Sequence, residues 1–433
     1  MKSKNKTLRF VIIIIAALIA LTGAGAAVFF IGFDPYSGTV SEFAASKELS
    51  EVLTAEEAVS DLDYMYNTIT QKHPAWLEDN EMPLEVKAGY EKERAFLLEK
   101  DSVTVLELWQ SSSRMFAALS DGHTRVGVNL SEKMYIDKLF ELPESELSAV
   151  DGKSAEDLMT LFKSMYFYED AVEFYAEQEF RQRILRREYL ELLGIDTSDG
   201  VVLSFEDGKT LDCGFITEEQ ALALQGEAEE STAVSSKIDA EHSLGILTLN
   251  ECTVDDEYLS VLGEFFNAVI SQNIKNVAVD LRANGGGNSN VINEFLKYID
   301  VGEYKITGGV SQRQGPFLLT FEGDTIKNEK KSEVFGGRLF VLTSADTFSS
   351  AMLFAETVSD NKLGEIIGEI PGNMPESYGD ILSFQTPCSG IIFTVSYKHF
   401  LRIDSEKAEE AVLPDFCVAA EDAEKQLYSL LQQ

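Results

Sequence analysis

Cysteine is scarce in this chain of 433 residues, and the four that occur lie far apart. They are Cys213, Cys252, Cys388 and Cys417, and no two of them have C-x-x-C spacing. The closely spaced thiols of zinc ribbons and thioredoxin-like redox centres are therefore excluded. Because free cysteine is among the most buried residue types, we expect most of the four to be small apolar side chains of the core.

Positive charge is also in short supply. The chain has 36 Lys and Arg against 73 Asp and Glu, which gives a formal net charge of −37. Duplex nucleic acid is bound by neutralising its phosphates with Lys and Arg, so nucleic acid is not an expected partner. The excess of acid favours solubility. A preference for cationic substrates or surfaces is the sharper alternative.

No repeat of 20–50 residues is visible in the sequence, which excludes solenoid and propeller architectures. The content of 45% apolar and 25% charged residues is that of a globular protein. A chain of this length exceeds one ordinary core, so two or three domains are expected.

The N-terminus departs from the general acidity. Residues 1–33 are predicted to be a membrane anchor or signal peptide, because basic residues precede an uncharged run at 10–33. As a helix this run reaches about 36 Å, enough to cross a hydrocarbon core of about 30 Å. The basic flank predicts a single-pass cell-membrane protein with most of the chain on the extracytoplasmic side. A secreted protein is the alternative, because Ala24-Gly25-Ala26 fits a cleavage site.

Residues 34–53 are predicted to be a linker, and residues 54–130 a small helical domain. Thr54-Ala55-Glu56-Glu57 has the form of a capping box and precedes apolar residues at helical spacing. Thr104-Val105-Leu106-Glu107 repeats this signal. The second helix would deliver Asp121-Gly122-His123-Thr124 at the C-terminal end of the domain.

Residues 131–235 form a less regular intermediate region. A long helical stretch is predicted to begin at Ser154 and to close at Leu193-Gly194, and residues 201–205 are predicted to be a strand. Residues 217–234 are acidic and poor in bulky apolar side chains, which predicts a surface loop.

Residues 236–433 are predicted to be an α/β core in which strands alternate with helices. Strands are expected at 245–249, 276–281 and 338–343, helices at 255–272, at 290–298 and from Ala351, and short strands near 366–367 and 391–396. The predicted fold class is thus α/β, with a β-α-β layered core preceded by a small helical domain and an N-terminal transmembrane helix.

Two turns of this core carry the chemistry. One strand runs into Gly285-Gly286-Gly287, where backbone N–H groups can approach a ligand with no side chain in the way. Another runs into Thr347-Phe348-Ser349-Ser350, just before a helix. A serine at such a turn, beside free N–H groups, can act as a nucleophile with an oxyanion hole. No Gly-Lys-Ser/Thr follows the glycines, which excludes a phosphate loop, and no metal-ligand spacing occurs, so no cofactor is expected.

These motifs resemble the signatures of C-terminal processing and tricorn-like serine peptidases. The family's order is met by 121–124, by 280–287, by 347–350 and by a further stretch at 367–380. The resemblance implies a layered peptidase core and a peptide or protein substrate.

The resemblance is best over 236–433 and looser over 55–130. Many family members carry a PDZ-like module between these parts, whose sheet edge binds a substrate C-terminus. Residues 131–235 lack the usual carboxylate-binding loop, so a degenerate or absent module is expected there.

The resemblance implies Ser349 as the nucleophile, two residues after the threonine that starts the turn. Ser350 is its near neighbour and Ser344 a weaker rival, and a helix N-cap is the structural alternative for such hydroxyls. His123 is implied as the general base, because an imidazole titrates near neutral pH. His399 is the histidine to test as a substitute.

A second branch of the family uses a lysine base beyond the nucleophile. The corresponding window, 371–377, contains no lysine, and Lys362 lies only 13 residues beyond Ser349. This difference favours the tricorn-like branch, with a Ser–His active site.

Tricorn-like members orient the base with a neighbouring serine and a glutamate from the C-terminal region. Gly122 stands where that serine would be, so the serine is missing. For the glutamate we choose Glu410, with Glu409 as its rival, because a carboxylate on the distal imidazole nitrogen would fix the tautomer. A solvated run of charge is the structural alternative.

The oxyanion hole is expected to be formed by the N–H groups of Gly286 and Ser350, while Asp280 and Arg282 brace the loop. The sequence thus predicts an exported serine peptidase that acts through an acyl-enzyme on Ser349. The alternative is a catalytically inactive peptide- or ligand-binding protein on the same fold, suggested by the missing lysine, the missing serine and the undecided acid.

Overall fold

The computed structural model describes residues 32–78, 81–225 and 232–432. Most of the predicted anchor, residues 10–31, lies outside these described residues. Among the helices that the structure describes, none combines the length and the apolar character needed to cross a membrane.

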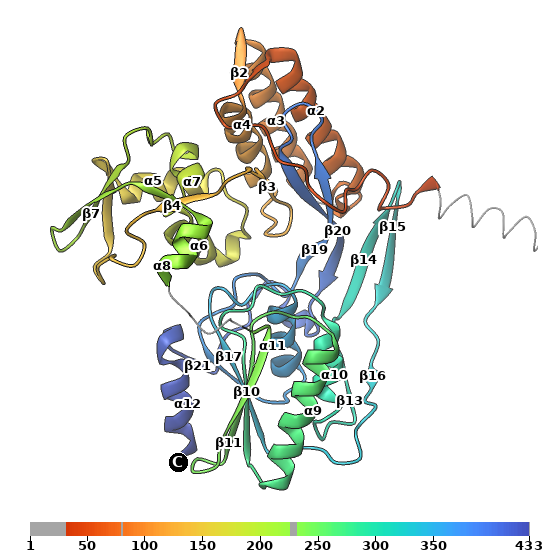
Figure 1. Ribbon diagram of the computed structural model, residues 1–433. Coiled ribbons are helices and arrows are strands. Elements are labelled where there is room, and N and C mark those ends of the chain that lie inside the picture. The colour runs from red at the N-terminus through yellow and green to blue at the C-terminus, as the bar shows by residue number, and fades with distance from the viewer. Residues whose placement is uncertain (1–31, 79–80, 226–231, 433) are drawn as a thin grey trace, which may run out of the picture.

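The lower part of the molecule is built on a six-stranded sheet, whose parallel strands form its centre (Figure 1). The strands, in sheet order, are β10 (Val234–Asp239), β11 (Leu244–Leu249), β12 (Asn276–Asp280), β17 (Arg338–Thr343), β18 (Glu365–Gly368) and β21 (Phe416–Cys417). Only β10 and β11 pair antiparallel. The central strands are apolar along their length because both faces of the sheet are covered.

Helices cover the two faces of this sheet. The helices α9 (Asp256–Ser271), α10 (Asn290–Leu296) and α11 (Ser350–Asp360) pack on one face, and α12 (Ala423–Leu431) packs on the other. The predicted strands at 245–249, 276–281 and 338–343 and the helices at 255–272 and 290–298 are confirmed to within two residues. The carboxyl ends of β12 and β17 therefore carry the glycine turn and the serine turn to the same edge of the sheet.

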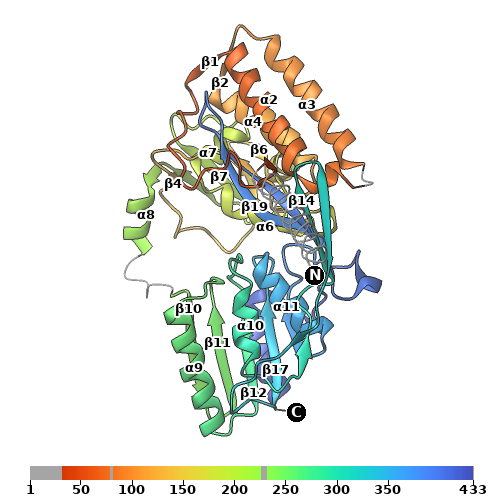
Figure 2. The same cartoon turned by 90° about the vertical axis from the view of Figure 1, so that its right-hand side faces the viewer.

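A second sheet rises from this core toward the upper part of the molecule (Figure 2). It contains β15 (Phe317–Glu322), β14 (Gly309–Gln314), β20 (Ile392–Leu401) and β19 (Ser377–Gln385), and the short strand β3 (Val126–Gly127) pairs with β20. The strand predicted near 391–396 therefore exists, but it lies in this second sheet and not in the layered core. The short pair β13 (Glu303–Tyr304) and β16 (Ile326–Lys327) completes this side.

The N-terminal region is helical, as predicted. It contains β1 (Val52–Thr54), α2 (Ala55–Lys72), η1 (Pro74–Trp76), α3 (Met82–Leu98), β2 (Ser102–Thr104) and α4 (Val105–Ala117). Both predicted capping boxes are present, with Thr54 and Thr104 as the N-caps. After α4 the chain turns into the segment that carries His123.

Two predictions for the intermediate region are wrong. The long helical stretch is broken into α5 (Ala155–Lys163), η2 (Asp170–Val172), α6 (Phe174–Arg183) and α7 (Arg187–Leu192). The acidic loop begins instead with α8 (Glu218–Gln225), because its Glu, Gln, Ala and Leu residues favour helix and Thr217 caps it through Gln220. The strand predicted at 201–205 is confirmed as β7 (Val201–Phe205).

The other strands of this region form two small sheets. One contains β6 (Lys153–Ser154), β5 (Leu147–Val150), β7 and β8 (Thr210–Cys213), and the other pairs β4 (Met134–Ile136) with β9 (Phe215–Thr217).

One hydrophobic core unites the upper part. It contains side chains from the N-terminal helices, from the intermediate region and from the β19–β20 hairpin. Phe348, beside the serine turn of the lower part, packs into the same core. The catalytic candidates therefore lie where the upper and lower parts meet.

The cysteines are all free. Cys213 and Cys252 are buried, Cys388 is half-buried and Cys417 is exposed. Only two of the four are therefore buried, whereas most were expected to be. Burial raises the pKa of the Cys252 thiol to about 12, which makes it unreactive at neutral pH.

Candidate active site

Ser349 occupies a strained turn at the start of α11. Its φ and ψ are 55° and −121°, a conformation that costs an L-residue energy and is concentrated at functional sites. Its N–H donates to Asn373 Oδ1 at 2.6 Å, which holds the turn. Although Ser349 stands at the N-cap position, its side chain makes no capping hydrogen bond. The structural alternative of a capping serine is therefore not what the geometry shows.

The glycine loop lies directly against this turn. A Cβ on Gly286 would lie 2.7 Å from Ser349 Cβ, and φ at Gly286 is 106°. A Cβ on Gly287 would lie 2.3 Å from the backbone oxygen of Cys252, with φ at 132°. Only glycine fits these two positions, and its use lets the loop backbone approach the serine closely.

The oxyanion donors differ from the expected pair. The N–H of Gly286 donates to Asn284 Oδ1 at 2.8 Å, so the predicted donor is already engaged. In the described chain, the N–H groups of Gly287 and Ser350 have no hydrogen-bond acceptor. Ser350 Oγ donates to the carbonyl of Gly287 at 2.7 Å and ties the two segments together. Gly287 and Ser350 are therefore the available pair.

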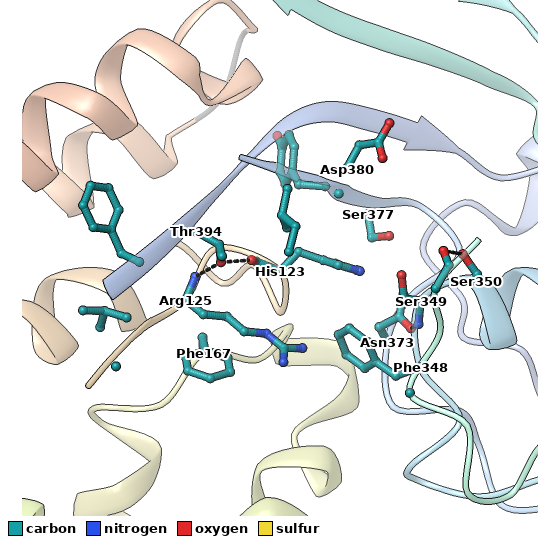
Figure 3. Close-up of a pocket in the computed structure, with 18 of the residues that line it drawn as sticks. His123, Arg125, Phe167, Phe348, Ser349, Ser350, Asn373, Ser377, Asp380 and Thr394 are labelled. Carbon is teal, nitrogen blue, oxygen red and sulfur yellow. Dashed lines mark hydrogen bonds between the residues drawn. The ribbon is translucent and has the colours of Figure 1, made fainter. Parts of the chain in front are cut away.

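His123 faces Ser349 from the opposite wall of the pocket (Figure 3). Its ring packs against Phe348, with the ring centres 4.8 Å apart. Its backbone is held by two bonds: its N–H donates to Asp121 Oδ1, and its carbonyl accepts from Thr394 Oγ1 on β20. The strand pairing of the second sheet thus positions this histidine.

The pKa of His123 is lowered to about 4, mainly by burial; the Asp121 carboxylate opposes this shift, and the positive charge of Arg125 contributes to it. The imidazole is therefore neutral at pH 7, as a general base must be. Its Nδ1 is buried and has no hydrogen-bond partner.

Asp121 anchors the segment beneath the imidazole. It accepts from Ser396 Oγ at 2.8 Å and from His73 Nε2 at 3.2 Å, and it lies 4.0 Å from His123 Nδ1. The N–H of Ala75 donates to His73 Nδ1, so we place the His73 proton on Nε2. Hydrogen bonding and charge from His73 lower the pKa of Asp121 well below its usual range, against the effect of burial, and keep it ionised.

Glu169 is a site residue that the sequence did not indicate. It lies just before η2, is buried, and accepts through Oε2 from the N–H of Met374, while its Oε1 has no partner. Burial raises the pKa of Glu169 to about 8, so the group is largely protonated at pH 7. One donor atom from each of Glu169, Asp121 and His123 lies within 4.8 Å of the others.

Glu410 lies away from His123, contrary to expectation. Its side chain is exposed, and its backbone carbonyl accepts from Arg402. Arg402 also pairs with Asp360, at the opposite end of α11 from Ser349. That helix of 11 residues is about 16 Å long. Glu409 is likewise exposed. The buried carboxyl groups near the base are therefore Asp121 and Glu169, and the more exposed Asp380 also acts on His123 by its charge.

The remaining candidates are engaged elsewhere. Ser344 Oγ donates to the carbonyl of Arg282, which is itself paired with Asp280, as the expected bracing role requires. His399 pairs with Glu78 at 2.9 Å.

Asp121, His123 and Glu169 also have the donor types of a divalent-cation site. Asp121 already accepts hydrogen bonds from His73, Ser396 and the N–H of His123, which leaves it little capacity for a metal. We therefore assign the three groups to proton chemistry.

These residues line a cavity of about 750 Å³ between the two parts of the molecule. The serine and glycine turns form one wall, His123 and Arg125 the opposite wall, and residues of α6 and α7 also line it. The cavity is wide enough for an extended peptide segment, because ligand pockets of about 300–1,000 Å³ bury most of a drug-sized molecule.

Comparison with known proteins gives a family match for the part of the chain that holds Ser349. Residues 243–418, which contain the parallel sheet, the glycine loop and Ser349, match Peptidase family S41. No protein of curated function matches the sequence.

Solved structures show the same fold. Mature CPAF has a TM-score of 0.60 at 14% identity, over 87% of this chain and 96% of that one. A serine-to-alanine mutant of CPAF has a TM-score of 0.62 at the same identity and coverage. The chain is thus a serine-type peptidase whose residues 243–418 match family S41, and its fold is that of mature CPAF.

Proposed function

We propose that the protein cleaves peptide bonds through an acyl-enzyme on Ser349, with His123 as the general base. The observation that carries this proposal is the strained turn of Ser349, set against the glycine loop and faced by a neutral, largely buried imidazole. A strained backbone persists only where the surrounding structure holds it, and such strain clusters at active sites.

The proposal assigns a group to each step. His123 takes the proton of Ser349 Oγ while that oxygen attacks the scissile carbonyl. The negative oxygen that forms is stabilised by the N–H groups of Gly287 and Ser350. The protonated imidazole then gives its proton to the leaving amine, and a water activated by the same imidazole hydrolyses the ester.

The ionised Asp121 beside the base would stabilise the charged form of the imidazole. Asp121 is ionised and lies 4.0 Å from Nδ1, so it favours the imidazolium that forms in the transition state. Glu169 has an unpartnered oxygen within reach of the same cluster. We assign to Asp121 the role that Glu410 was expected to fill, with Glu169 beside it.

A fluorophosphonate probe is expected to label the protein covalently, and Ser349→Ala is expected to abolish that labelling, because the probe reacts only with an activated hydroxyl. Mass spectrometry of the labelled peptide checks the position. Ser344→Ala is the matched control: the Ser344 hydroxyl donates to the carbonyl of Arg282 and accepts from the N–H of Asp346, so its loss should leave labelling of Ser349 in place. Undiminished labelling of Ser349→Ala would remove this residue from the nucleophile role.

A catalytically inactive binding protein is the second candidate. The observation that favours it is that no hydrogen bond joins Ser349 Oγ to His123 in the described residues. Catalytic hydrogen bonds often tighten only when substrate binds, so this geometry does not decide the matter. Peptide binding without turnover across a diverse library at pH 6–9, in a protein that the probe does not label, would establish the binding function.

We further propose that the enzyme is exported and held at the membrane by residues 10–33, on the basis of their length and apolar character. The full-length chain is expected to stay with membranes after carbonate extraction, whereas a chain starting at residue 34 should be released. Release of both forms would favour the secreted alternative.

A further inference from the structure

Arg125 stands out among the charged residues that line the cavity. It comes two residues after His123 and shares the same wall (Figure 3). Its Nε donates to the carbonyl of Gly122, which fixes the plane of the guanidinium. Nη1 and Nη2 donate to no group of the described chain, and Arg125 lines the cavity.

Two aromatic rings hold this guanidinium in place. Its central carbon lies 4.9 Å from the ring centre of Phe167 and 4.9 Å from that of Phe348. The second of these rings also packs against His123 and directly precedes Ser349 in the chain. The cation is thus locked beside the two reactive residues, in a setting where aromatic walls displace water and strengthen an ionic bond.

The other cations around the cavity already have carboxylate partners. Arg183 pairs with Glu179 at 2.7 Å, Arg186 pairs with Glu188, and Lys398 pairs with Asp380. Arg125 has no carboxylate within 4.0 Å among the residues that the structure describes. Its charge is therefore available to a ligand.

We propose that Arg125 binds a carboxylate of the substrate and so makes this peptidase selective for peptides that carry one near the scissile bond. The two free Nη groups form the planar fork that matches the two oxygens of a carboxylate. The assignment rests on the proposed function of Ser349 and His123, and it names the substrate class of that site. It also contradicts the preference for cationic substrates that the net charge of −37 suggests.

A peptide offers a carboxylate in two ways, at its own C-terminus or on an Asp or Glu side chain. A matched peptide set separates these sources: one backbone sequence with a free or an amidated C-terminus, and with Asp, Asn or Lys at each position around the cleaved bond. We expect the carboxylate form of one pair to be cleaved at least tenfold better in kcat/KM than its neutral partner, with the difference mainly in KM.

Arg125→Gln is expected to reduce that ratio to near one while neutral peptides are still cleaved. The ratio of kcat/KM for the carboxylate peptide to that for the neutral peptide is measured for each enzyme at pH 8, where His123 is neutral. Any effect that loss of the Arg125 charge has on His123 then applies to both peptides and cancels in the ratio. Arg125→Lys keeps the charge but not the fork and should retain part of the preference. Lys398→Gln removes another cavity cation and should leave the ratio unchanged.

A binding measurement gives a second readout that does not need turnover. In the Ser349→Ala background, calorimetry with the carboxylate and neutral peptides should show the same preference, and Arg125→Gln should remove it. Equal cleavage of all pairs by the unaltered enzyme would overturn the role of Arg125 while leaving the peptidase intact. Absence of cleavage and of probe labelling would instead overturn the proposed peptidase mechanism, and the calorimetric preference would then decide the role of Arg125 alone.

Discussion

His123→Ala is expected to lower kcat by several orders of magnitude, on the order of 10⁴–10⁶, because nucleophile and base act as one unit. The fold should survive the change, since the imidazole Nδ1 has no hydrogen-bond partner and the segment is held through its backbone. Circular dichroism and thermal unfolding check the fold, and steady-state kinetics check the rate. His399→Ala is the comparison, and it should remain active because that histidine pairs with Glu78.

The pH dependence of the unaltered enzyme gives an independent test of the base. Activity requires neutral His123, so kcat/KM should fall as pH drops through the pKa of this group, which burial lowers to about 4. The acid limb should therefore lie well below the ordinary histidine value of about 6.5. A limb above pH 9 would point to a lysine base. A folded His123→Ala variant with near-normal turnover, beside an inactive His399→Ala, would show that the wrong histidine was chosen.

The second large effect is expected from Glu169→Gln, on stability. Burial raises the pKa of Glu169 to about 8 in the folded protein from an ordinary value of 4.5. Between these values the folded state holds a proton that the unfolded state has released. The contribution of the Glu169 proton to the free energy of unfolding is therefore complete below pH 4.5. It is lost as pH rises toward 8, by about 1.4 kcal/mol per pH unit. Glutamine cannot ionise and can still accept the N–H of Met374, so the variant should escape this loss.

The free energy of unfolding, measured by denaturant titration at pH 5, 6.5 and 8, should thus favour the variant increasingly as pH rises. Other buried groups that titrate in this range, such as Glu356 with its pKa raised to about 8, are present in both proteins and cancel in the difference. Glu410→Gln is the control, and its exposed side chain should leave the pH dependence unchanged. Parallel curves for the unaltered protein and Glu169→Gln would show that Glu169 is ionised in the folded state.

The layered core could be predicted because its signals are local. The strands β12 and β17 are continuous apolar runs. Each capping box is a pattern of four consecutive residues that marks the start of a helix. The serine turn could be placed because it directly follows a recognisable strand. These patterns depend on neighbours in the chain.

The rest of the site depends on contacts between distant segments. Glu169 lies in a region without strand alternation, and its position at the base follows from its bond to Met374, 205 residues away. The direction of the Gly286 N–H is decided by the side chain of Asn284, which no glycine motif reveals. Glu410 was chosen from sequence order alone, and the chain path after β20 carries it to the far end of α11.

The β19–β20 hairpin has a consequence for the order in which the enzyme forms. Thr394 and Ser396 on this hairpin bond to His123 and Asp121, so the base is held in place by residues more than 270 positions later in the chain. Synthesis supplies the N-terminal part first, and domains fold largely in that order. The base can be fixed only after about 400 residues have been made. Until then the base is not held in position beside Ser349, so the growing chain is expected to be inactive as a peptidase.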